Sequence, residues 1–404
     1  MGESNQFTEK RNRWVTGLSN LLKDLLFIVL IPLWQLVDLL VPKDRSSLIF
    51  LLQTDTFRGD IRTFFHYCMQ KTGFQSYVMV KQYRTYQQLK RQFPRHVLYI
   101  YQPLHLLIFL RAKYVFASHY RHLKPLYVPY GTKIVIGLQH GVTALKKGYY
   151  LQNPHPLYKR PYDYVVASSE FQKPIVAENM RIEPNRIWVT GYPRLDDLYR
   201  PDDRFLSDVP EIKGKKVILY APTFQDRAPV VLFPFPDFNP DELKAKLREG
   251  DAVLLIKFHP NTGEQLQIVK KNLRHILSPD LICLMTSVQI QDLNRILQYI
   301  DLLITDYSSI FFDYLFFNKP VIFLPGDLAS FRKKRGFIIE YMENTPGPKI
   351  SQFNRFLDTM ETCLKHPETD ENRRIAIREK FFKYDTAGNC DRVWDHFIRL
   401  RGKV

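Results

Sequence analysis

The chain has 404 residues, which is too long for one ordinary hydrophobic core and suits two domains. Hydrophobic residues make up 45% of it, a share that excludes long disordered tracts. The net charge of +17 predicts a negatively charged partner or substrate, such as a nucleic acid, an anionic membrane surface or a phosphate compound.

The segment 1–44 is predicted to be an amphipathic helical segment that associates with a membrane. Trp14 and the leucines after it recur at helical spacing, and a basic cluster precedes them. The apolar stretch 25–41 is interrupted by Pro32 and Asp38, so it is shorter than the roughly 20 residues that a spanning helix needs. We therefore expect a helix that lies on the membrane, with packing on the protein's own core as the alternative. No signal peptide is visible.

From residue 46 the pattern becomes that of buried strands with helix-compatible segments between them. Runs that are apolar on both faces are typical of parallel sheets. The polar, proline-bearing stretch 199–216 is predicted to be a domain linker, and 351–400 is predicted to be helical. The predicted strands cover 46–53, 76–81, 96–101, 113–118, 133–139, 162–169, 186–192, 216–223, 252–259, 281–287, 301–309 and 320–326.

This pattern predicts two doubly wound α/β halves in tandem. The predicted bounds are 45–203 for an N-terminal Rossmann-like domain and 204–404 for a C-terminal one that ends in helices. Ligands in such sheets bind outside the carboxyl ends of the strands. The residues that follow the strands are therefore the candidates for a functional site.

Several strand ends are polar, and the richest is the stretch after the strand that ends near Thr305. Asp306, Ser308 and Ser309 crowd the start of a helix, and Asp313 follows one turn later. Exposed N–H groups at a helix start attract anions, and hydroxyls add donors, so we expect a phosphate site. Simple helix capping is the alternative. The two carboxylates are expected to orient donors or to accept from a sugar or glycerol hydroxyl.

Two histidines, His140 and His259, follow strands in different halves and are predicted to face one another on domain closure. Histidine suits proton abstraction from an alcohol near neutral pH. Lys257 and Arg335 are expected to stabilise phosphoryl oxygens, although the basic run 332–335 also fits a solvated face. Arg194 and Thr223 likewise follow predicted strands.

Other site chemistries have no sequence support. The chain has neither GxGxxG nor GxxxxGK[ST], which disfavours a nicotinamide enzyme or a P-loop NTPase. None of the four cysteines forms a CxxC pair, and no Cys/His cluster has metal-ligand spacing, so we predict neither a disulfide framework nor a zinc site, in keeping with a reducing cytoplasm.

Taken in order, the strand-end residues resemble the CDP-glycerol glycerophosphotransferase family of teichoic-acid synthesis, over roughly 130 to 350. The matching motifs are Gln139-His140-Gly141 with Lys146, Gly191-Tyr192-Pro193-Arg194 with Asp196, Leu219 to Thr223, Lys257-Phe258-His259-Pro260, Thr305 to Ser309 with Phe312-Asp313, Lys319-Pro320, and Arg335-Gly336-Phe337 with Pro346-Gly347-Pro348.

The resemblance implies a GT-B architecture and a peripheral enzyme on the cytoplasmic face of a bacterial plasma membrane. It implies transfer of glycerol phosphate from CDP-glycerol to a hydroxyl of a polyprenyl-diphosphate-linked acceptor, with release of CMP and with no cofactor. His140 matches the family's proposed base. His259, Ser308, Ser309 and Asp313 match donor-site positions, and Lys146 is carried over as a substrate-binding residue. Many family members have Trp where this chain has Gln139, which leaves the acceptor open.

Several alternatives stay open at this stage. The donor could be CDP-ribitol. A GT-B glycosyltransferase that uses a nucleotide sugar would share the fold and the way in which the donor phosphates are bound. A basic scaffold for nucleic acid or membrane is the non-enzymatic alternative. Because the aromatic residues follow buried-strand patterns rather than forming a stacking platform, we expect no nucleic-acid partner. Homo-oligomerisation is left open.

Overall fold

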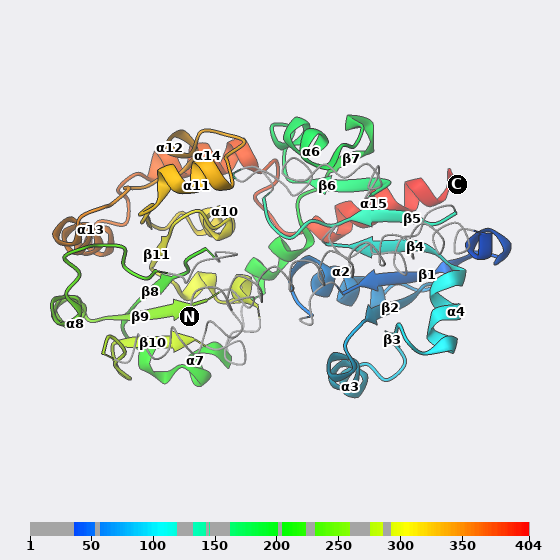
Figure 1. The fold of residues 1–404 in the computed structure, drawn as a ribbon, viewed down its shortest axis with the longest axis horizontal. Coiled ribbons are helices and arrows are strands. Elements are labelled where there is room, and N and C mark those ends of the chain that lie inside the picture. Colours follow the sequence, from blue (N-terminus) through cyan, green and yellow to red (C-terminus); the bar gives the residue numbers. More distant parts are fainter. Residues whose placement is uncertain are drawn as a thin grey trace, which may run out of the picture. The chain divides into compact units, whose positions relative to one another are not determined.

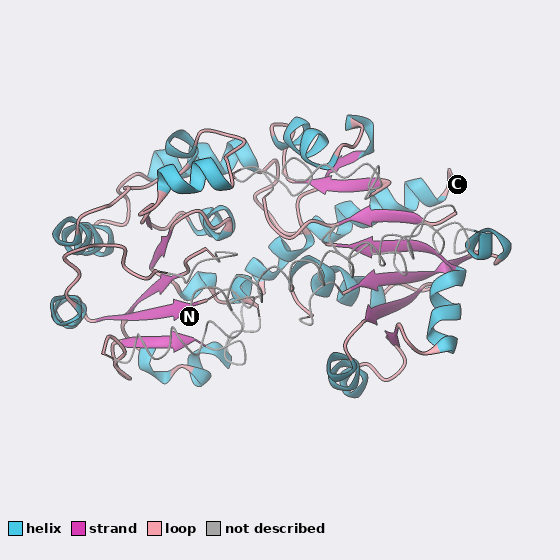
Figure 2. Ribbon diagram, in the orientation of Figure 1, coloured by secondary structure: helices cyan, strands magenta, loops and turns pink. Residues whose placement is uncertain are grey.

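The computed structural model describes residues 36–52, 57–118, 132–142, 145, 162–200, 204–223, 231–258, 275–285 and 292–403. Within these ranges the protein is an α/β fold with two parallel sheets (Figures 1 and 2). Residues 1–35, which hold most of the predicted membrane-associating segment, lie outside the described residues, as do Lys146 and His259.

The first sheet has the strand order β3-β2-β1-β4-β5-β6-β7. The interior strand β1 is buried from Ser47 to Leu51 and pairs in parallel with β2 and β4. This explains why its sequence is apolar on both faces. The strands are β1 (Asp44–Leu51), β2 (Gln75–Val80), β3 (Val97–Tyr99), β4 (Ala112–Ala117), β5 (Ile134–Gly137), β6 (Tyr164–Ala167) and β7 (Ile187–Val189).

The second sheet has the order β10-β9-β8-β11-β12, again with parallel pairs. Its core includes side chains from the helices Pro240–Glu249 (α8) and Phe353–Lys365 (α13), which lie together beside the sheet (Figure 1). The strands are β8 (Lys216–Tyr220), β9 (Ala252–Lys257), β10 (Ile282–Met285), β11 (Leu302–Thr305) and β12 (Val321–Phe323). All twelve predicted strands are therefore confirmed.

Helices and 3₁₀ turns connect the strands, and the predicted helical stretch at the C-terminus is confirmed as three helices. The helices are α2 (Gly59–Met69), α3 (Tyr83–Gln92), α4 (Pro103–Arg111), α6 (Gln172–Met180), α7 (Arg204–Asp208), α8, α10 (Ile310–Tyr314), α11 (Leu328–Lys334), α12 (Tyr341–Asn344), α13, α14 (Glu371–Phe381) and α15 (Asn389–Arg401). The 3₁₀ turns are η2 (Pro184–Arg186), η3 (Pro193–Tyr199), η4 (Pro210–Ile212), η6 (Leu293–Arg295), η7 (Leu297–Tyr299) and η8 (Leu315–Phe317).

The stretch predicted as a polar linker is more ordered than expected. It contains α7 and η4, and Phe205, Val209 and Ile212 are buried there. These three apolar residues are spaced by three or four positions, so they anchor a helical segment within an otherwise polar sequence.

Contacts between Cα atoms divide the chain into two compact units. Unit 1 comprises Met1–Thr56, Cys68–Gly137 and Pro161–Asp163, and unit 2 comprises Phe57–Tyr67, Leu138–Arg160 and Tyr164–Val404. Every candidate site residue that the structure describes falls in unit 2. The predicted domain bounds at 45–203 and 204–404 stay a prediction.

Within unit 2, the segment after β7 caps a helix that is distant in the sequence. Asp196 Oδ1 accepts from the backbone N–H of Gly388 and Asn389 at 3.0 and 2.9 Å, and Oδ2 accepts from Cys390 N–H at 2.9 Å. These are N–H groups that a helix start leaves without partners. A buried carboxylate thus fixes the start of α15.

We predict that Asp196→Ala lowers the free energy of unfolding by about 2–3 kcal/mol, because several buried N–H groups lose their acceptor. Urea denaturation followed by circular dichroism measures this loss. Asp241→Ala, in the exposed first turn of α8, is the control and should cost less than about 0.5 kcal/mol. Equal small losses in both variants would contradict the capping role.

Candidate functional site

The carboxyl ends of β9, β8 and β11 lie side by side in the second sheet, because these strands are neighbours and parallel. They are followed by Lys257 with Phe258, by Ala221 to Thr223, and by Asp306. Three of the predicted site motifs therefore meet at one edge of a sheet, where ligands bind in doubly wound folds.

The carboxylate of Asp306 accepts hydrogen bonds from neighbouring residues of the protein at this edge. It accepts from the N–H of Thr223 at 2.9 Å, from the Thr223 hydroxyl at 2.5 Å and from the N–H of Tyr307 at 2.5 Å. The predicted roles of Asp306 and Thr223 at a substrate site stay a prediction. Their observed contacts join the ends of β8 and β11 and so fix the start of the turn that follows.

That turn carries Ser308 and Ser309, both half-buried, directly before α10. The N-cap residue Ser309 makes no side-chain capping hydrogen bond. Ser308 Oγ accepts from Ile310 N–H only at 3.5 Å, which is at the limit of a hydrogen bond. Simple capping, the alternative to the predicted phosphate site, therefore has little support in these contacts, and the phosphate site itself stays a prediction. The helix is shorter than expected, since α10 has 5 residues before it tightens into η8.

The turn with His140 lies against the turn with Ser309, and both belong to unit 2. A Cβ atom placed on Gly141 would lie 2.8 Å from Ser309 Oγ, so only glycine fits there without a shift. Further along the same loop, Leu145 C=O accepts from Ile338 N–H at 3.2 Å. The loop of the exposed His140 is thus placed between the Ser309 turn and the segment that follows Arg335 and Gly336.

The backbone before His140 is in an uncommon conformation. Gln139 is buried and has φ = 64°, in the left-handed region that non-glycine residues rarely adopt. Such strain persists where the surroundings enforce it, and it often marks functional turns. Here it sets the direction of the chain that presents His140.

Cationic side chains also lie near this edge. Burial, together with repulsion from Arg58, lowers the pKa of Lys257 to about 8. Burial likewise lowers the pKa of Arg58, in spite of attraction from Asp292. The sequence does not single out Arg58, because this residue belongs to no motif and lies in the turn before α2. Arg335 is exposed at the end of α11.

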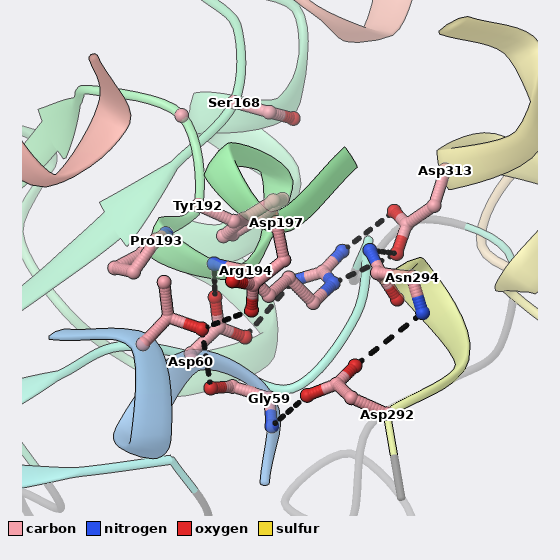
Figure 3. Close-up of polar contacts among 12 residues, drawn as sticks. Gly59, Asp60, Ser168, Tyr192, Pro193, Arg194, Asp197, Asp292, Asn294 and Asp313 are labelled. Carbon is pink, nitrogen blue, oxygen red and sulfur yellow. Dashed lines mark hydrogen bonds and ion pairs between the residues drawn. The ribbon is translucent and has the colours of Figure 1, made fainter. Parts of the chain in front are cut away.

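Arg194 and Asp313 are buried and bind each other (Figure 3). Arg194 Nε and Nη2 donate to Asp313 Oδ2 and Oδ1 at 2.8 and 2.9 Å, and Asn294 Nδ2 donates to Oδ2 at 2.9 Å. Arg194 Nη1 also donates to Asp60 Oδ2 at 3.0 Å, while its backbone N–H donates to Asp60 Oδ1 at 2.9 Å. The role in substrate binding predicted for Arg194 and Asp313 stays a prediction, and the structure gives them protein partners.

A second arginine, Arg62, forms two ion pairs beside this cluster. Arg62 lies 3.1 Å from Asp197 and 3.3 Å from Asp292, and Asp292 accepts from Gly59 N–H at 3.1 Å. Asp60, Arg62 and Asn294 were all missed in the sequence. Each lies outside the motifs, and no local pattern signals a pairing between residues so far apart along the chain.

The charges of the cluster shift its pKa values. Burial raises the pKa of Asp60 to about 6, against the opposing attraction of Arg194, which Asp60 shares with Asp313. Although burial alone would lower it, the carboxylates of Asp313 and Asp60 raise the pKa of Arg194. Arg194 therefore stays charged, and the pKa of Asp60 lies well above the usual range of a carboxyl group.

We predict a pH-dependent difference in stability between the wild type and Asp60→Asn. Because the pKa of Asp60 is raised on folding, its stabilising effect is complete below its unfolded pKa and is lost as the pH rises through about 6. On going from pH 7 to pH 5, the wild type should gain about 1 kcal/mol relative to Asp60→Asn.

Urea denaturation of both proteins at each pH gives this difference, in which the titrating groups that do not interact with Asp60 cancel. A difference that is independent of pH would contradict the raised pKa of Asp60.

Among the described residues, no group of three or more His, Cys, Asp or Glu side chains is arranged to hold a metal ion. In the same part of the chain, no helix is long and apolar enough to cross a membrane.

Comparison with known families gives a match over most of the chain. A family model described as CDP-Glycerol:Poly(glycerophosphate) glycerophosphotransferase matches residues 34–398. The chain is 30% identical over 243 residues to the teichoic acid ribitol-phosphate polymerase TarL of Staphylococcus aureus, a match that covers 58% of this chain and 41% of that protein. It is also 30% identical over 238 residues to a teichoic acid glycerol-phosphate primase of Bacillus subtilis, covering 59% and 57% of the two chains.

A third relative, a teichoic acid ribitol-phosphate primase of Bacillus spizizenii, is 29% identical over 299 residues, covering 67% of this chain and 71% of that protein. This chain thus spans about half the length of the first two relatives.

Among solved structures, the wall teichoic acid polymerase TagF is similar in fold. The TM-score is 0.71 at 21% identity, with 96% of this chain and 98% of the other covered. The Staphylococcus aureus MnaA–UDP structure is similar with a TM-score of 0.57 at 13% identity, covering 89% and 98%. The fold is therefore a GT-B-like α/β fold with parallel sheets.

Proposed function

The chain belongs to the CDP-glycerol:poly(glycerophosphate) glycerophosphotransferase family, and we propose that it transfers an alditol phosphate from a CDP-linked donor to a hydroxyl of a lipid-linked acceptor in teichoic-acid synthesis, with release of CMP. CDP-glycerol is the donor that we propose first. The reaction needs no cofactor beyond this donor.

One observation carries the proposal. The turn of the predicted base His140 and the turn of the predicted phosphate-binding residues Ser308 and Ser309 are neighbours, since Gly141 packs against Ser309 Oγ. A base and a phosphate site must lie close together for an acceptor hydroxyl to attack a donor phosphorus. The two turns come from distant parts of the sequence, so neither motif by itself implies that they are neighbours.

In the mechanism that we propose, His140 takes the proton of the acceptor hydroxyl as its oxygen attacks the glycerol-bearing phosphorus. The bond from that phosphorus to the oxygen of CMP breaks, and CMP leaves with the electron pair. Ser308, Ser309, Lys257 and Arg335 stabilise the negative charge on the diphosphate and then on CMP. His259 and Lys146, which lie outside the described residues, are assigned to the donor and substrate sites by the family resemblance.

CDP-ribitol is the second candidate donor, because relatives of this chain are ribitol-phosphate polymerases and primases. CDP-glycerol and CDP-ribitol present the same diphosphate to the enzyme, so the Ser308–Ser309 turn does not discriminate between these two donors. Other residues must distinguish the glycerol group from the ribitol group.

Release of CMP from each donor by the purified full-length chain tests the proposal, with and without a prenyl-diphosphate-linked acceptor analogue. Acceptor-dependent CMP from CDP-glycerol, with a product heavier by glycerol phosphate, is the expected result. Turnover of CDP-ribitol alone would reassign the donor, and transfer of a sugar from a nucleotide sugar would overturn the reaction class.

We predict that Ser309→Ala raises the KM for the donor, and that His140→Ala lowers kcat by about 10²–10⁴-fold, the usual contribution of a general base. The reasons differ: the first change removes a donor to the diphosphate, and the second removes the proton acceptor. Steady-state kinetics of CMP release separates the two effects. Wild-type kinetics in either variant would remove that residue from the mechanism.

We predict that kcat/KM for the donor falls as the pH rises above about 8, because Lys257 then loses the proton that makes it a cation. Lys257→Arg keeps the charge to higher pH and should move this fall upward. A profile that is identical in the variant would show that another group is responsible.

We propose a peripheral location at the cytoplasmic face of the plasma membrane, against an anionic surface. The net charge of +17 and the exposed side chains of Leu36, Leu39 and Leu40 at the start of unit 1 support it. Failure to co-sediment with vesicles that contain anionic lipid at low salt would overturn this location.

The two-domain organisation is part of the same proposal. We assign residues 1–44 to the membrane-associating segment, 45–203 to the acceptor domain and 204–404 to the CDP-donor domain. The two separate parallel sheets support this division. Homo-oligomerisation stays open, and we propose no nucleic-acid partner.

A further inference from the structure

The buried carboxylate of Asp60 and the guanidinium of Arg194 hold the element that carries the proposed phosphate site. Asp313 lies on α10, one turn after Ser309, and it is anchored by the bidentate pair with Arg194 and by Asn294 (Figure 3). Arg194 is in turn anchored by two hydrogen bonds to Asp60. Two segments, η3 and η6, therefore bind the Asp313 carboxylate of α10 directly, and α2 supports it through the contacts of Asp60 with Arg194.

The short length of α10 makes this anchor important. A helix of 5 residues has few internal hydrogen bonds, so its place in the fold depends on its side chains. Phe311 and Phe312 hold its apolar side through ring contacts with Phe323 and Phe381. Asp313 is the ionic anchor. Its two oxygens accept from two N–H groups of the planar Arg194 fork, which fixes direction as well as distance, and one of them also accepts from the amide of Asn294.

The composition of the cluster favours a geometric role. A buried arginine that serves two carboxylates is a costly way to stabilise a fold, because apolar side chains of similar volume often do as well. Its advantage is directional, because two parallel N–H···O hydrogen bonds fix the orientation of the partner carboxylate as well as its distance. A shift of the Ser308–Ser309 turn would alter how its hydroxyls meet a diphosphate.

We propose that Asp60 and Arg194 are positioning residues that set the place of the Ser308–Ser309 turn through Asp313 and thereby control the affinity for the donor. Neither side chain contacts the donor in this account. Asp60 holds Arg194, Arg194 holds Asp313, and Asp313 holds the helix start. The effect on the donor rests on the proposed function, whereas the effect on the turn does not.

The test compares Arg194→Lys, which keeps the charge but loses the fork, and Asp60→Asn, which keeps one acceptor, with the wild type. Lys133→Met is the control for damage to a buried ion pair elsewhere, because it removes the cation that binds Asp38 in unit 1. Two quantities are measured: KM and kcat for CMP release from CDP-glycerol and CDP-ribitol, and amide hydrogen exchange of the peptide 306–314 in the absence of donor.

We expect Arg194→Lys to raise the donor KM by about 10- to 100-fold, the usual effect of losing a hydrogen bond to a charged group, with a smaller change in kcat. Exchange in 306–314 should become faster. Asp60→Asn should show both effects more weakly. Lys133→Met should lower the unfolding midpoint while leaving KM and the exchange of 306–314 at wild-type values.

Each outcome decides the proposal. Unchanged exchange of 306–314 in folded Arg194→Lys overturns it, and so does faster exchange with an unchanged donor KM. If Arg194→Lys does not fold, Asp60→Asn decides by the same two criteria. If the wild type releases CMP from neither donor, the proposed function has failed, and the exchange measurement alone still decides whether Asp60 and Arg194 place the turn.

Discussion

The bidentate ion pair between Arg194 and Asp313 is the interaction on which the site in unit 2 depends. Arg194 belongs to η3, a run of 7 residues that also carries Asp196 and Asp197. Asp196 caps α15, and Asp197 lies 3.1 Å from Arg62 on α2. One short segment after β7 thus sets the positions of α2, α10 and α15, which are far apart along the chain.

The carboxylates and the hydroxyls at the site have different surroundings, and this arrangement explains the difference. The carboxylates of Asp306 and Asp313 accept hydrogen bonds from the protein, and both lie beside the turn between β11 and α10. The hydroxyls of Ser308 and Ser309 do not cap the helix in the usual way. Carboxylates that face inward and hydroxyls that lack a capping role suit a surface for an anion, since a carboxylate facing the ligand would repel it.

Much of the fold could be predicted from the sequence because buried parallel strands have a strong signature. Each of the twelve strands is a short apolar run, and the polar residues at the ends of β8, β9 and β11 fall where the sheet order brings them together. The site residues were harder to predict. Asp306 and Arg194 are conspicuous as polar strand-end residues, but nothing in the sequence indicates that they bind Thr223 and Asp60. Such pairings depend on side-chain packing between distant segments, which periodicity does not record.

A structure of the protein with CDP-glycerol bound would test the central claim most directly. We expect diphosphate oxygens within hydrogen-bonding distance of Ser308 or Ser309, with the glycerol-bearing phosphorus facing His140. The ion pair of Arg194 and Asp313 should stay intact beneath the bound donor. A diphosphate bound elsewhere, or one that contacts Arg194 after displacing Asp313, would contradict the account.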